Sequence, residues 1–123
     1  MADKIVVLVT CGSFSEGRKI ARELVEARLA ACVNLLESPV RSLYRWKGEM
    51  ESSSEYLLLI KSRMGLFRSI RKKVQDLHSY EVPEIIALPI LQGSRAYLSW
   101  IKANTRSVAK SAKTRARKTP RGK

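Results

Sequence analysis

A few side chains in this sequence have the chemistry to bind a soft divalent metal ion. The chain has one histidine, His78, and two cysteines, Cys11 and Cys32. Imidazole and thiolate are ligands that copper and zinc prefer, and carboxylates such as Glu81 and Glu84 can supply oxygen donors. We therefore treat His78 as the first candidate metal ligand, helped by a cysteine or by Glu84, with Cu(II) or another divalent cation as the ion.

Each of these residues also has a purely structural interpretation. His78 falls at the end of a predicted helix, where an imidazolium interacts well with the helix dipole. Cys32 has the features of a small buried core residue. One histidine and two cysteines cannot complete a Cys/His zinc site within one chain, and nothing indicates a secreted disulfide framework. We predict that no cofactor is required for folding.

A second candidate site consists of aromatic and polar side chains. Small ligands bind in clefts lined by aromatic residues with a few polar groups. Tyr and Trp also gather at protein interfaces because they bury a large area. Packing is favoured for Tyr44 and Trp46, and both alternatives stay open for Lys61, Tyr80 and Glu84. The full set of ligand-pocket or interface candidates is Cys32, Tyr44, Trp46, Lys61, Tyr80, Glu81, Glu84 and Trp100.

Catalysis is the least supported use of these residues. Cys11 lies in the turn Thr10-Cys11-Gly12-Ser13, where a helix N-terminus could lower a thiol pKa or bind an anion. A strand-to-helix turn with a serine cap explains the same residues. The only histidine is far along the sequence, and no Asn or Asp can be assigned to orient it. We predict no catalytic residues and no enzyme activity.

The apolar pattern predicts five strands and three helices. The expected strands are 5–9, 30–36, 40–46, 55–61 and 84–88, and the expected helices are 15–28, 66–78 and 94–104. Ser13 and Glu16 have the spacing of a capping box for the first helix. Two βα units joined by a hairpin favour an α+β, ferredoxin-like βαββαβ sandwich with an antiparallel sheet and an extra C-terminal helix.

The hairpin within residues 40–61 is long for a small domain. Its strands exceed the usual range, and Tyr44, Trp46 and Tyr56 lie along it. The sheet face without helices would also be left open in a single copy. We therefore expect another subunit to cover this face.

Positive charge is concentrated at the C-terminus. The 123 residues include 24 basic and 11 acidic side chains, for a net charge of +13. Residues 106–123 contain eight Lys or Arg, no acid and one large apolar residue, Val108. Such a segment cannot offset its ordering entropy by burial. We predict a domain over residues 1–105 and a disordered basic tail over 106–123.

This tail suggests an alternative function, non-specific binding of a polyanion such as nucleic acid. The βαββαβ topology also occurs in RNA-binding modules that stack bases on strand aromatics. The first strand here has no aromatic residue, and the third offers only Tyr56, so specific RNA recognition is not predicted. The apolar run at residues 5–9 is too short for a signal peptide or a membrane span, which predicts a cytoplasmic protein without membrane contact.

Several motifs resemble one known family, the CutA divalent-cation tolerance proteins. They are LAACVN at 29–34, SLYRWKGE at 42–49, EYLLLIK at 55–61, HSYEVPEII at 78–86 and YLSWI at 97–101. The resemblance covers about residues 4–105. It implies a ferredoxin-like protomer, a homotrimer built by hairpins that pair between neighbours, and a role in tolerance of copper and other divalent metals, with no firmly established reaction.

The resemblance also implies three copper ligands in the metal-binding relatives. These are a cysteine directly before the threonine of the first strand and a pair of histidines before Tyr80. This sequence has Val9 and Leu77 at two of the three positions and keeps only His78, and Ser79 replaces the usual proline. The predicted function is therefore divalent-cation tolerance by a homotrimer that binds copper, another divalent metal or a small ligand weakly at its subunit interfaces.

Overall fold

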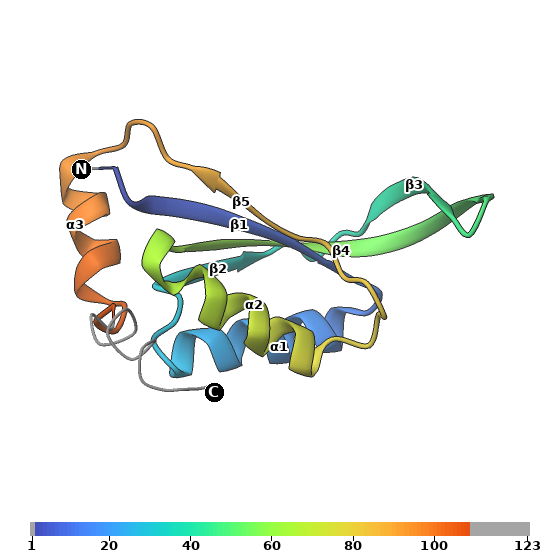
Figure 1. Ribbon diagram of the computed structural model, residues 1–123, viewed down its shortest axis with the longest axis horizontal. Helices are drawn as coiled ribbons and strands as arrows, with labels where there is room; N and C mark the ends of the chain where they lie inside the picture. The colour runs from blue at the N-terminus through green and yellow to red at the C-terminus, as the bar shows by residue number, and fades with distance from the viewer. Residues whose placement is uncertain (1, 109–123) are drawn as a thin grey trace, which may run out of the picture.

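The structure is a computed structural model that describes residues 2–108. The elements follow the order β-α-β-β-β-α-β-α, because the long hairpin adds a strand that pairs outside the main sheet (Figure 1). They are β1 (Lys4–Cys11), α1 (Phe14–Glu26), β2 (Cys32–Leu35), β3 (Val40–Trp46), β4 (Glu49–Arg63), the 3-10 helix η1 (Met64–Leu66), α2 (Phe67–Leu77), β5 (Ile85–Pro89) and α3 (Arg95–Ala103).

The main sheet has the strand order β2-β4-β1-β5, and every pair in it is antiparallel. Helices α1 and α2 lie side by side on one face, and α3 lies across the end of the sheet that is far from the hairpin (Figure 1). This arrangement confirms the predicted α+β class, the antiparallel sheet and the additional C-terminal helix.

The hydrophobic core lies between the sheet and the two helices. In β1, Ile5, Val7 and Val9 are at most 2% exposed, and they face the buried residues Ile20 and Leu24 of α1 within one cluster. Alternate residues of a strand point to opposite faces. The continuous apolar run in β1 therefore supplies the core from one face and an apolar surface on the other.

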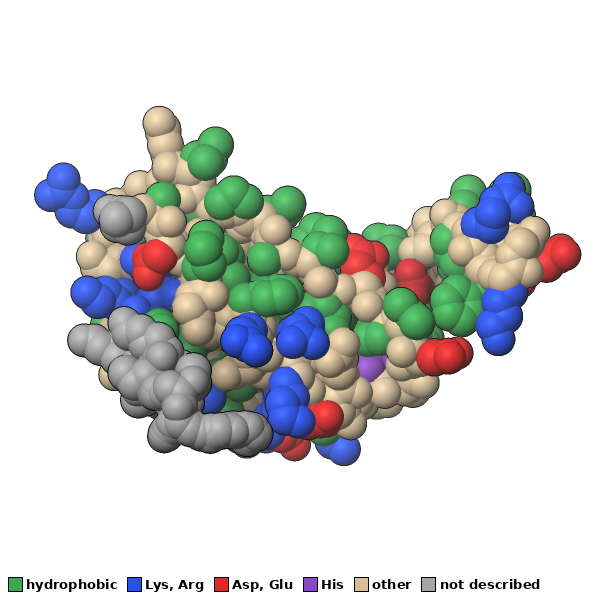
Figure 2. Space-filling model, viewed as in Figure 1, with side chains coloured by type: hydrophobic (Ala, Val, Ile, Leu, Met, Phe, Trp, Pro, Cys, Tyr) green, Lys and Arg blue, Asp and Glu red, His purple; other side chains and the backbone are tan. Residues whose placement is uncertain are grey.

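That second surface is the open face of the sheet. Strand register places Val6 and Leu8 of β1 beside Leu88 and Ile86 of β5. Ile86 and Leu88 are 47% and 48% exposed. Figure 2 shows hydrophobic side chains gathered along the part of the surface that overlies β1 and β5. An apolar sheet face of this kind remains unburied in the single copy.

The β3–β4 hairpin projects from the opposite end of the sheet (Figure 1). Its register runs from Val40↔Glu55 to Trp46↔Glu49, and the connecting Lys47 and Gly48 have φ angles of 51° and 84°. Two consecutive positive φ angles are typical of the tight type I′ hairpin turn. Strand β4 starts at Glu49, six residues before the strand predicted at 55–61, because β3 pairs with its serine-rich half.

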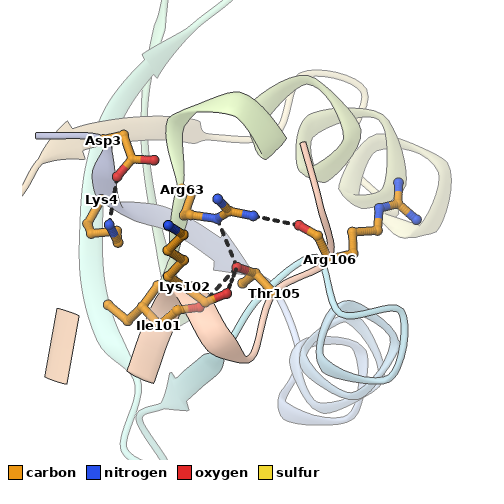
Figure 3. A network of polar contacts seen from close by, with 7 residues as sticks. All are labelled: Asp3, Lys4, Arg63, Ile101, Lys102, Thr105 and Arg106. Carbon is orange, nitrogen blue, oxygen red and sulfur yellow. Dashed lines mark hydrogen bonds and ion pairs between the residues drawn. The ribbon is translucent and has the colours of Figure 1, made fainter. Parts of the chain in front are cut away.

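The last described residues are tied to the domain by Arg63 (Figure 3). Its Nε donates to Thr105 Oγ1 at 3.0 Å and its guanidinium donates to the carbonyl of Arg106 at 2.7 Å. The N–H of Arg106 donates to the carbonyl of Arg28 at 2.8 Å. These hydrogen bonds tie the chain to the domain as far as Arg106.

The rest of the predicted basic tail, from residue 109 to residue 123, lies outside the described residues. The polyanion-binding alternative depends mainly on those residues and stays a prediction. Across the described part of the chain, no helix combines the length and apolar character needed to cross a membrane.

Candidate functional site

Three potential metal ligands meet where the sheet and both helices converge. Cys11 is the last residue of β1 and points to the helix-covered face, Glu16 lies in the first turn of α1, and His78 caps the end of α2. One ligand atom of each residue lies within 4.8 Å of the others. We call Cys11, Glu16 and His78 the Cys-Glu-His cluster.

Both ring nitrogens of His78 have close polar neighbours. Nε2–H donates to the carbonyl of Thr10 at 2.8 Å, and the N–H of Tyr80 donates to Nδ1 at 3.0 Å. Nδ1 also lies 3.2 Å from Glu16 Oε2. A cation placed between these two atoms would be attracted by both.

Cys11 is fully buried and remains a thiol at neutral pH. Burial raises the pKa of Cys11 from 9.0 to about 12, and the negative charges of Glu16 and Glu55 add to this effect. A neutral thiol is a poor nucleophile. The predicted turn at Thr10–Ser13 thus does not activate Cys11, in agreement with the structural interpretation of that turn.

Glu16 has a role in the structure that was not predicted from the sequence. Ser13 caps α1 as predicted, since its hydroxyl accepts a hydrogen bond from the N–H of Glu16 at 3.2 Å. The Glu16 carboxylate, however, accepts from the N–H of Ser79 at 3.2 Å. It therefore links α1 to the segment after α2 and reaches His78. The sequence analysis missed it as a candidate ligand because its spacing from Ser13 already had a local explanation.

A pocket of about 650 Å³ opens beside the base of the hairpin. Five of the eight predicted ligand-pocket residues line it, namely Tyr44, Trp46, Tyr80, Glu81 and Glu84. Figure 2 shows the molecule hollowed between its body and the hairpin, with Asp or Glu side chains in the hollow. The structure therefore brings most of the predicted set together within one copy, and we call this cavity the hairpin pocket.

Glu55 is the charged residue of the pocket lining that was not predicted from the sequence. It lies in β4 at the start of the pairing with β3 and is only 7% exposed. Burial raises the pKa of Tyr80, and a hydrogen bond from its hydroxyl to Glu55 raises that pKa further. The signal that could have identified Glu55 is its position as a lone carboxylate before the apolar run 56–60.

The three remaining candidates, Cys32, Lys61 and Trp100, lie elsewhere. Cys32 and Lys61 are cross-strand partners on the open sheet face, and Lys61 Nζ donates to Asn34 Oδ1. Trp100 stacks on Tyr97 of α3, with ring centroids 5.5 Å apart. Lys61 is six residues along β4 from Glu55, which corresponds to about 20 Å. One copy therefore does not place these residues in the hairpin pocket.

Cys32 also differs from its predicted role as a buried core residue. It is half-buried on the open face, because its strand position alternates with the core residue Val33. Burial raises the pKa of Tyr97, and the nearby Cys32 contributes to that shift. Cys32 therefore packs against α3 at the end of the sheet rather than in the core beneath the helices.

Together, these features define a ferredoxin-like α+β protein with a projecting hairpin, a pocket at the base of that hairpin and an open apolar sheet face. Residues 5–104 match the family described as CutA1 divalent ion tolerance protein. The chain belongs to this family, as its sequence motifs had indicated.

Two relatives and one solved structure illustrate the similarity. The divalent-cation tolerance protein CutA of Thermus thermophilus is 49% identical over 100 residues, which cover 81% of this chain and 96% of that protein. The chloroplastic protein CutA of Arabidopsis thaliana is 46% identical over 103 residues, covering 84% of this chain and 56% of that protein. A Thermus thermophilus structure of this family superposes with a TM-score of 0.81 at 48% identity, covering 84% of this chain and 99% of that one.

Proposed function

We propose that this protein acts in divalent-cation tolerance by binding a divalent metal ion weakly at the Cys-Glu-His cluster, without catalysing a reaction. Membership of the divalent ion tolerance family supports the general role. The Thermus relative is itself named a divalent-cation tolerance protein. The metal ligands of this chain differ from those that the sequence resemblance implied, because Val9 and Leu77 have no donor atoms.

The observation that supports this site is the convergence of three ligand atoms within 4.8 Å. A metal ion bound at about 2.0–2.3 Å from nitrogen, oxygen and sulfur would bring these atoms to roughly 3–4 Å from one another. Small side-chain movements are enough to reach that geometry. The combination of sulfur, nitrogen and oxygen donors suits Cu(II) or Zn(II) better than Mg(II) or Ca(II).

Two costs keep the predicted affinity low. Cys11 must lose its proton, although the pKa of its thiol is about 12. The N–H of Tyr80 must also give up Nδ1 of His78 as its acceptor. An unsatisfied buried donor costs about 1–3 kcal/mol. Because metal and protons compete for the same thiol, we expect affinity to increase with pH.

The test measures Zn(II) and Co(II) binding by calorimetry on the full chain. Co(II) adds a spectroscopic signature, since a bound thiolate gives a charge-transfer band in the near ultraviolet. We expect His78→Ala and Glu16→Gln each to weaken binding at least tenfold and Cys11→Ser to remove the Co(II) band. Cys32→Ala and Glu84→Gln serve as controls and should leave both measurements unchanged.

An isotherm that does not change in His78→Ala would contradict the site. His78 would then have only the structural role of joining α2 to Thr10. Loss of metal binding in Cys32→Ala would instead indicate a site on the open face, and loss in Glu84→Gln a site in the hairpin pocket. Each of these results is distinct from the expected one.

We also propose that the protein works as a homotrimer, as the family resemblance implies. Two features of the single copy support a larger assembly. The open face leaves Ile86 and Leu88 about half exposed, and the hairpin extends beyond the sheet. A cytoplasmic location stays a prediction from the sequence, and the Arabidopsis relative is named chloroplastic.

A further inference from the structure

We propose that the hairpin pocket binds a small organic ammonium ion, with Glu55 as its counter-charge and Trp46 and Tyr44 as its aromatic walls. The pocket adjoins the Cys-Glu-His cluster, because Tyr80 lines the pocket and its N–H donates to Nδ1 of His78. The cluster itself lies on the helix-covered side of the sheet. The proposal does not depend on metal binding.

The charge of the pocket is opposite to that of the chain. The whole sequence carries a net charge of +13. The described pocket lining contains three carboxylates, Glu55, Glu81 and Glu84, and no Lys, Arg or His. A concave surface lined by charges of one sign concentrates the field and attracts the opposite charge. The pocket therefore favours cationic ligands over the anions that the rest of this basic chain would attract.

Glu55 is the strongest individual reason for a cationic ligand. Glu55 is buried, with a relative solvent exposure of only 7%. No Lys or Arg nitrogen of residues 2–108 lies within ion-pair distance of its carboxylate. Tyr80 lines the same pocket, and its hydroxyl brings no positive charge. A buried carboxylate with no compensating cation gains most when a ligand supplies one.

The side chains that line the pocket favour an organic cation over a metal ion. Tyr44 and Trp46 present aromatic rings, and Leu43 and Val82 add apolar surface. Aromatic faces attract ammonium groups through cation–π interactions and also contact their carbon substituents. A bare metal ion needs several oxygen ligands at about 2.0–2.6 Å. A cavity of about 650 Å³ falls within the usual range for small-molecule sites.

A cation–π contact within the chain already occurs at the hairpin turn. Lys47 Nζ lies 5.8 Å from the centre of the Trp46 ring. Trp46 is 39% exposed, so the ring still has free area to contact a second group. The aromatic side chains of β3 are therefore placed to interact with positive charge.

The experiment uses choline and its uncharged carbon isostere, in which carbon replaces the quaternary nitrogen. Saturation-transfer NMR on the ligand methyl groups and quenching of tryptophan fluorescence report binding to the full-length protein. We expect saturable binding of choline and at least tenfold weaker binding of the isostere. High salt should weaken choline binding and leave the isostere unchanged.

Two pairs of variants assign the binding to this pocket. Glu55→Gln keeps the size and the acceptor for Tyr80, and it should weaken choline binding at least tenfold. Glu37→Gln, an exposed change of equal charge outside the pocket, should have no effect. Trp46→Ala should weaken binding about three- to thirty-fold, and Trp100→Ala should not.

Several outcomes would overturn the proposal. They are equal binding of choline and its isostere, unchanged binding in Glu55→Gln, and no binding to the assembled wild-type protein. The last result would mean that a side chain of a second copy already fills the pocket. If Glu55→Gln does not fold, the Trp46 and Trp100 pair decides the question, because the aromatic wall is required independently.

Discussion

At the scale of single residues, Cys11 shows how one position on a strand decides the chemistry of a side chain. It ends β1 on the face covered by the helices, where it is 0% exposed and near Glu16 and Glu55. Both burial and the neighbouring carboxylates favour the neutral thiol. The same residue one position earlier or later would point to the open face.

This environment predicts a loss of stability at alkaline pH. The pKa of Cys11 is about 12 in the folded chain, against 9.0 for a thiol exposed to water. Below about pH 9 the thiol is protonated in both states and has no effect. Above that value the unfolded chain ionises first, so the free energy of unfolding falls by up to about 1.4 kcal/mol for each further pH unit, until the folded pKa is reached.

Urea unfolding with a metal chelator present at about pH 8 and about pH 10 measures this effect. The decrease should be smaller in Cys11→Ala than in the wild type by up to about 1.4 kcal/mol. Cys32→Ala should keep the wild-type decrease. If the free energy of unfolding decreases equally in Cys11→Ala and the wild type, the thiol has the same pKa in the folded and unfolded chains.

At the scale of elements, the N-terminus of α1 connects stability with the metal site. The Ser13 hydroxyl accepts from the N–H of Glu16, and Glu16 supplies the carboxylate of the Cys-Glu-His cluster. The cap therefore fixes the first turn of the helix in the orientation that brings this carboxylate to His78. A matched cap occurs on α3, where Ser94 accepts from the N–H of Tyr97 at 3.1 Å.

We predict that Ser13→Ala and Ser94→Ala each lower the free energy of unfolding by about 1 kcal/mol, since each loses an N-cap hydrogen bond. Ser13→Ala should also weaken Zn(II) binding a few fold, whereas Ser94→Ala should leave it unchanged. Chemical denaturation and calorimetry measure the two effects. Equal metal affinities in the two variants would show that the Ser13 cap does not contribute to metal binding.

At the scale of the whole molecule, the open sheet face determines the expected assembly. Ile86 is 47% exposed and lies next to Leu8 in the sheet, so the surface around it is apolar. Burying such a surface against neighbouring copies would stabilise an oligomer by the hydrophobic effect. A charge placed at its centre would have to lose its water on assembly, at a cost of several kcal/mol.

We therefore expect the wild type to have the mass of a trimer by light scattering at micromolar concentration and Ile86→Glu to be mainly monomeric. Val25→Glu is the control, because Val25 is similarly exposed, at 42%, but lies on α1 in the helical layer. Circular dichroism should show that both variants keep the fold. A wild-type protein with the mass of a monomer would contradict the trimer.

The order and type of the elements, the antiparallel fold and the family could all be predicted from the sequence. The apolar run in β1, the helical spacing of Ile70 and Val74, and the serine caps are local patterns, and local patterns reflect backbone geometry directly. The sequence also predicted half of the residues that line the hairpin pocket, because Tyr44, Trp46 and Tyr80 are chemically unusual residues in short motifs.

Which residues share a site became clear from the three-dimensional structure alone. Glu16 and His78 are far apart in sequence and meet because both helices cover the same face beside Cys11. Lys61 and Glu55 are on one strand, yet the extended strand separates them by about 20 Å. Strand register and helix placement set such distances, and these depend on packing across the whole chain, which no local pattern contains.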